Sequence, residues 1–174
     1  MIAGTTRQMY RVVAWTSGLT LVAVIIYGVV STLLTTGGVL QIGETLVAID
    51  FPFPPYFAKP ISYFSVAAVA FFYSSLRLWE ERITGWPPML IAFLQLIGFV
   101  VAFASAYEVM YNFMLWGAIF SVEFLRNVTD PSFIATPFSI PWNFVFATKA
   151  FSALFVISGY SVYFLRRLGK EAPL

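Results

Sequence analysis

Long apolar runs, separated by polar or proline-containing segments, set the pattern of this chain. The apolar runs cover residues 12–34, 61–79, 88–107 and 142–165. Each is close to the roughly 20 residues with which a helix crosses about 30 Å of hydrocarbon. The pattern predicts an all-α integral membrane protein, a four-helix bundle with two long outer loops that forms a single transmembrane domain over residues 1–174.

The third run does not stop where a membrane span would. A second apolar stretch continues to residue 122, so a single helix from Met89 to Val122 would be about 50 Å long. Such a helix exceeds the hydrocarbon thickness of a bilayer. We expect one of two arrangements: the helix projects beyond the membrane, or the chain turns near Glu108 into a second segment in the interface or against a partner.

A short polar connection joins the second run to the third. Gly85 is placed to end a helix, and Pro87 and Pro88 suit the first turn of the next one. The connection predicts that the second and third spans are antiparallel neighbours. Arg77 and Trp79, at the end of the second span, are expected to anchor it at the membrane interface.

The other two connections are long and contain prolines, which exclude long helices. Within the first, residues 39–49 are apolar enough for a short re-entrant or interfacial piece, or for a lid over the end of the bundle or a partner surface. The first apolar run is expected to remain as an uncleaved helix, because the apolar region of a signal peptide is only about 7–15 residues long.

The composition limits the kinds of functional site that the chain can form. Hydrophobic residues make up 60% of the chain and charged residues 10%, against about 25% charged residues in a soluble domain. The chain has no Cys and no His, so disulfides and the usual zinc, copper, haem and iron–sulfur ligand sets are excluded. We expect no metal, no cofactor and no catalytic residues. Met110 and Met114 lie one turn apart, where methionine is expected to fill a core rather than bind copper.

The basic residues predict an orientation. Seven of them lie at the N-terminus, in the short connection and at the C-terminus, whereas only Lys59 and Arg126 lie in the long loops. By the positive-inside rule both termini of this cell-membrane protein are expected to be cytoplasmic. Because the basic residues flank apolar runs and form no patch, membrane lipids are expected partners and nucleic acid is not. Asn127 begins an Asn-Val-Thr glycosylation pattern on the predicted outer side.

Two charged residues inside apolar runs are candidates for a site. Glu108 lies about 30 Å along its helix from Pro88, and Lys149 lies about 10 Å along an oppositely directed helix from Trp142, so they reach a similar depth. Asn112 lies one turn beyond Glu108, on the same face. Charged groups within a membrane suggest a proton or ion relay or a cradle for a ligand headgroup. The alternative is an ion pair or hydrogen bond that fixes the register of the helices.

Helix packing is predicted from small residues at a four-residue spacing. Gly98, Ala102 and Ala106 share one face of the third span and allow another helix to approach closely.

Parts of the chain resemble uncharacterised small membrane proteins of ammonia-oxidising archaea. The resemblance covers the residues YSSLRLWEER at 73–82, WPP at 86–88 and YEVMYNFMLWG at 107–117. It implies an accessory subunit of the copper-dependent ammonia monooxygenase or of a neighbouring respiratory complex. The metal-binding subunits of such a monooxygenase depend on His-rich sites, so a chain without His would be a supporting subunit.

The expected function is that of a non-catalytic accessory subunit, with other integral membrane subunits as partners. The absence of catalytic residue types, the small-residue helix face and the apolar loops favour it. One alternative is a small proton-coupled transporter or channel that uses Glu108 and Lys149. Another is an enzyme subunit whose aromatic residues shape a quinone or lipid pocket.

Overall fold

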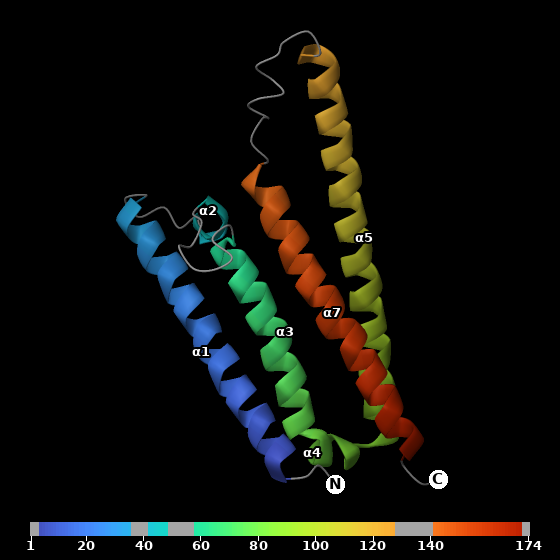
Figure 1. The fold of residues 1–174 in the computed structure, drawn as a ribbon. Helices are drawn as coiled ribbons and strands as arrows, with labels where there is room; N and C mark the ends of the chain where they lie inside the picture. Colours follow the sequence, from blue (N-terminus) through green and yellow to red (C-terminus); the bar gives the residue numbers. More distant parts are fainter. Residues whose placement is uncertain (1–3, 36–41, 49–57, 128–140, 172–174) are drawn as a thin grey trace.

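The computed structural model describes residues 4–35, 42–48, 58–127 and 141–171. Among these residues four long helices account for most of the fold: α1 (Gly4–Thr35), α3 (Pro60–Leu78), α5 (Pro88–Asn127) and α7 (Trp142–Glu171). Two short helices, α2 (Ile42–Ala48) and α4 (Glu80–Thr84), lie at opposite ends of the molecule (Figure 1). We call these ends the α2 end and the α4 end. All four long helices are long and apolar enough to cross a membrane, which confirms the predicted fold class and indicates a multi-pass membrane protein.

Hydroxyl-bearing residues are accommodated within α1 by local hydrogen bonds. Thr16 and Ser17 donate to the carbonyl of Val13, at 3.1 and 2.5 Å, and Thr20 donates to that of Thr16 at 2.9 Å. A hydroxyl that bonds one turn back along its own helix leaves no polar group unsatisfied in hydrocarbon. These polar residues therefore do not interrupt the first span.

The long helices pack in the order α1, α3, α7, α5. Figure 1 shows α7 between α3 and α5, and α7 packs closely against both. The second and third spans are thus antiparallel, but the prediction that they are packed neighbours is wrong. The reason lies in α4 and the prolines after it, which give the short connection enough reach to pass the end of α7.

α5 is a continuous helix of 40 residues that passes Glu108 without a turn. Of the two arrangements that the sequence allowed, the structure has the long projecting helix. It even continues five residues beyond the expected limit at residue 122, to a length of about 60 Å. Figure 1 shows its C-terminal part rising above the upper ends of the other helices.

Buried apolar side chains form one cluster at each end of the molecule. At the α4 end, Phe164, Leu165 and Leu168 of α7 pack against Ile83 of α4 and Ile91 of α5. At the α2 end the buried members are Val24, Leu46, Val47 and Ile61, from α1, α2 and α3. The middle of the α3–α7 contact therefore lies between two cores and belongs to neither.

The described part of the first long connection covers the bundle end as a lid. α2 packs against α1, α3 and α7, and Thr45 is hydrogen-bonded to Thr32 of α1 at 2.9 Å. Gly43 lies so close to α7 that an added Cβ would come within 2.9 Å of the Trp142 ring. The packing of α2 against three long helices is the arrangement expected for a lid.

Candidate functional site

Lys149 joins α7 to α3 near the α2 end. Its side chain is half-buried, and its ammonium donates a hydrogen bond to the hydroxyl of Ser62. One turn further along α3, Ser65 Oγ donates to the carbonyl of Ile61 at 2.8 Å and lies 3.4 Å from the Lys149 carbonyl. Small serine side chains let α7 approach α3 here, so the lysine links the two helices at a fixed register.

A groove of about 630 Å³ extends from this contact toward the α4 end. We call it the α3–α7 groove. Its lining consists of Ser62, Ser65, Val66, Val69, Ala70 and Tyr73 on α3, Lys149, Ser152, Ala153 and Val156 on α7, and Val13 on α1. Between the polar groups at its two ends the walls are valine, alanine and serine, which are too small to fill the space between the helices.

A smaller cavity of about 220 Å³ lies on the other side of α7, against α5. We call it the α5–α7 cavity. Asn112, Trp116, Thr148 and Lys149 contribute its polar groups. The Nδ2 atom of Asn112 is buried and has no hydrogen-bond partner within the described part of the chain. The structure thus brings Asn112 and Lys149 to one cavity, although they come from different helices.

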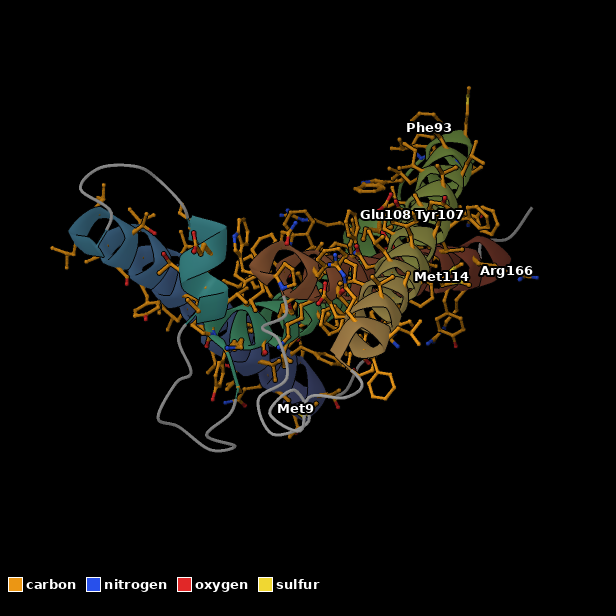
Figure 2. The ribbon with its side chains drawn as sticks, turned by 90° about the horizontal axis from the view of Figure 1, so that it is seen from above. Met9, Phe93, Tyr107, Glu108, Met114 and Arg166 are labelled. Carbon is orange, nitrogen blue, oxygen red and sulfur yellow. The ribbon has the colours of Figure 1, made fainter. Side chains whose placement is uncertain are left out.

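Glu108 is not joined to Lys149. Both residues are described by the structure, and no ion pair or hydrogen bond links them. Figure 2 shows Glu108 and the neighbouring Tyr107 on α5. The ring of Tyr107 stacks on that of Tyr111 at a centroid distance of 6.3 Å, and both side chains are exposed. The geometry therefore links Lys149 to α3, and it gives no direct contact through which the two charges could exchange a proton.

Met110 and Met114 of α5 lie outside the core. Met110 is 65% exposed and Met114 is 72% exposed, so the expectation that they fill a core is wrong. Both lie on the side of α5 that faces away from α7, where no helix among the described residues packs. Within the described ranges no three Asp or Glu side chains come together in a way that could hold a metal ion.

An arginine–aromatic cluster at the α4 end was not recognised in the sequence. Arg77, expected only as an interfacial anchor, is 17% exposed and pairs with Glu80 at 3.3 Å. Its guanidinium lies over the rings of Tyr73 and Phe164, 5.9 and 5.7 Å from their centroids. Tyr73 in turn contacts the ring of Tyr160 at 4.7 Å. The cluster ties α3 to α7 at the end opposite Lys149.

Three buried polar atoms of this region have no hydrogen-bond partner in the described part of the chain: Ser74 Oγ, Arg77 Nε and Tyr160 Oη. The spacings Tyr73–Arg77 and Tyr160–Phe164 are both one helical turn, which was visible in the sequence. They became informative only once α3 and α7 were known to face each other.

The remaining predicted residues fall on α5. Gly98 faces α7, since an added Cβ would lie 3.0 Å from Val162 Cγ2, and Ala102 and Ala106 are half-buried. Asn127 is the last residue of α5, and the Val-Thr that completes its glycosylation pattern lies outside the described residues.

The absence of a Glu108–Lys149 contact gives a prediction about additivity. In a double-mutant cycle with Glu108→Gln and Lys149→Met, the coupling free energy is expected to be below about 0.5 kcal/mol, because within the described ranges no ion pair or hydrogen bond joins the two side chains. The measurement is the free energy of unfolding in detergent for the unmodified chain, both single variants and the double variant. A coupling above about 1 kcal/mol would mean that the two charges interact directly.

Comparisons with known proteins add no assignment to this geometry. The chain matches no family model, and neither the curated proteins nor the solved structures gave a match.

Proposed function

We propose that the chain is a non-catalytic subunit of a larger membrane complex and that α5 binds another integral membrane subunit. The observation that carries the proposal is the extent of exposed apolar surface along α5. That surface is longer than a bilayer can cover.

The lengths of α3 and α5 can be compared with the thickness of the hydrocarbon layer. The 19 residues of α3 correspond to about 28 Å, close to the roughly 30 Å of hydrocarbon in a bilayer. On α5, large exposed apolar side chains extend from Met89 to Leu125, which is about 54 Å along the helix axis. Even at a tilt of about 40°, the upper end of the usual range, this segment would span about 41 Å of membrane depth. About 10 Å or more of apolar helix therefore extends beyond the hydrocarbon.

At the projecting end of α5, apolar side chains are exposed outside the hydrocarbon and must be buried by something other than lipid. Leu125 is 73% exposed, and an added Cβ at Gly117 would meet nothing within 4 Å. Lipid cannot reach this segment if the hydrocarbon is already matched by α3. Exposed apolar surface of this extent marks a contact with another protein. The exposed apolar surface of α5 continues from the hydrocarbon of the bilayer into the region outside it. An integral membrane partner can contact α5 along this whole length.

The resemblance to small membrane proteins of ammonia-oxidising archaea indicates which complexes to test first. These are the ammonia monooxygenase and its neighbouring respiratory complexes. Because the chain has no His and no Cys, we expect it to act in such a complex as an accessory subunit and not as a metal-binding one.

Substitution at the tip of α5 should weaken assembly. Leu125→Glu places a charge on the exposed apolar end, outside the hydrocarbon, so the chain should still fold while a partner is repelled. We expect about tenfold less co-purification of other membrane subunits, measured by mass spectrometry of bands from native gels, which corresponds to about 1.4 kcal/mol of binding free energy. Met9→Glu is the matched control, because Met9 is 55% exposed at the far end of α1 (Figure 2). Unchanged co-purification by Leu125→Glu would contradict the proposal.

The proposed orientation places both termini and α4 in the cytoplasm, on the basis of the basic residues at that end. Single cysteines at Thr84 of α4 and at Ala48 of α2, both exposed, test it in a chain that has no other cysteine. In intact cells a membrane-impermeant thiol reagent is expected to label Ala48→Cys and not Thr84→Cys. The opposite labelling pattern would reverse the topology.

A further inference from the structure

Exposed residues on α5 recur with the spacing of a coiled-coil seam. One row consists of every seventh residue from Met89 to Phe124, and a second row consists of every seventh residue from Phe93 to Ser121. We call the two rows together the α5 seam. Every residue in it is exposed, and Figure 2 shows three of them, Phe93, Tyr107 and Met114, along α5. Alternating spacings of four and three residues let two helices stay in contact along their whole length.

The α5 seam can contact a copy of itself without bringing like charges together. It contains no Asp, Glu, Lys or Arg, and its polar side-chain groups are the hydroxyls of Tyr107 and Ser121. Ser121 Oγ donates to the Gly117 carbonyl at 2.8 Å, so it brings no unpaired donor to a helix contact. Charge therefore does not oppose the pairing of two identical seams.

The seam also has a position at which two backbones can approach closely. Gly117 and Ser121 are four residues apart, which is the small-residue spacing found where membrane helices pack tightly. An added Cβ at Gly117 would meet nothing within 4 Å. This part of α5 is open to the backbone of a second helix.

The projecting end of α5 favours a second copy of the chain as that helix. Two copies have the same orientation in the membrane, so a two-fold axis along the membrane normal places their α5 helices side by side at equal height. Each projecting end then covers the other over its whole length. Figure 1 shows that the upper ends of the other described helices do not reach this height.

The area of the seam is sufficient for a stable dimer. Its nine large side chains are 42–86% exposed. Since a large side chain presents roughly 150–200 Å² when fully exposed, covering them would bury on the order of 900 Å² per copy. A stable interface buries about 800 Å² per partner. Within the hydrocarbon the contact is stabilised by close packing, and above it by the burial of apolar surface from water.

We infer that α5 pairs in parallel with α5 of a second copy of this chain, along the α5 seam. The inference rests on the proposed function, because it names the partner of the α5 surface described there.

Single cysteines test the pairing in native membranes, because the chain has no cysteine of its own. Met114→Cys and Ser121→Cys lie in the seam. Leu115→Cys and Val122→Cys are the matched controls, since each is exposed at nearly the same height but lies about 100° further around the helix. The membranes are treated with the oxidant copper phenanthroline. Non-reducing electrophoresis then measures the yield of the disulfide-linked dimer, and mass spectrometry identifies the chains in its band.

We expect the two seam cysteines to give about tenfold more dimer than the two controls, because a disulfide requires Cα atoms within about 7 Å of each other. Gly117→Leu, added to the Ser121→Cys chain, should lower the dimer yield about tenfold, because a leucine from each copy would have to fit at the closest approach of the helices. The double variant is checked for folding by gel filtration in detergent. If it does not fold, the contrast between Ser121→Cys and Val122→Cys decides the question.

Failure of this inference can be distinguished from failure of the proposed function. Equal dimer yields at all four positions would indicate random collisions, and together with the absence of any dimer that result would overturn the pairing. Crosslinking of the seam cysteines only to a different protein would also overturn it, but would leave α5 as a subunit contact. If in addition Leu125→Glu co-purified with other membrane subunits as the unmodified chain does, the proposed function would fail as well.

Discussion

Arg77→Leu is expected to destabilise the folded chain by about 3 kcal/mol, at the low end of the cost of breaking a buried ion pair. The Arg77 side chain is 17% exposed and pairs with Glu80, which is 19% exposed. Leucine would leave the Glu80 carboxylate without this partner and would remove the guanidinium from the rings of Tyr73 and Phe164. For a chain of this size the loss corresponds to a fall in Tm of about 6–12 °C, measurable by circular dichroism in detergent.

A second arginine of the chain provides the control. Arg126 also pairs with a glutamate three residues away, Glu123, at 3.6 Å, but its side chain is 73% exposed. Arg126→Leu is therefore expected to cost less than about 1 kcal/mol. If the two variants lowered Tm equally, burial of the Arg77 cluster would not contribute to stability.

The positions of the four spans were predictable because lipid leaves the backbone few choices. An apolar segment within hydrocarbon must satisfy its N–H and C=O groups internally, so a long uninterrupted run becomes a helix. Proline-rich and polar segments then divide the helices. The same reasoning explains why Ser and Thr did not interrupt α1, since their hydroxyls bond to its carbonyl oxygens.

The lateral order of the helices was not predictable from the same pattern. Every span presents apolar surface on all sides, so hydrophobicity does not say which faces meet. Small residues decide this locally: Gly98 on α5 allows Val162 of α7 to approach, and Ser65 on α3 lies 3.4 Å from the Lys149 carbonyl. A small residue shows only that a close approach is possible, and it does not identify the partner.

The candidate site was predictable in its charges but not in its contacts. Lys149 and Glu108 stand out because ionisable groups are rare in membrane spans. One hydrogen-bond partner of Lys149 is Ser62, which is 87 residues away and one of many hydroxyl residues in the spans. The α3–α7 groove is harder still to foresee, because it depends on small side chains from two helices meeting over several helical turns.

Gly98→Leu is expected to destabilise the folded chain by about 2–3 kcal/mol through overpacking of α5 against α7. A Cβ at this position would already lie 3.0 Å from Val162 Cγ2 and 3.6 Å from the Ser158 carbonyl oxygen. Three further carbon atoms cannot fit without moving one helix away from the other. Separation would also loosen the cluster of Ile91, Phe164 and Leu165 at the α4 end.

Two variants isolate this steric effect from the change in backbone flexibility. Gly98→Ala adds only the Cβ, and the small shift it demands of Val162 is offset by the gain of about 0.4–1 kcal/mol from a less flexible unfolded chain, so its net effect should be close to zero. Gly117→Leu adds the same side chain to the same helix where nothing lies within 4 Å, so the chain in detergent without partners should lose no stability. The free energies of unfolding of the three variants are compared under identical conditions. Equal destabilisation by Gly98→Leu and Gly117→Leu would show that the close approach of α5 to α7 at Gly98 does not hold these helices together.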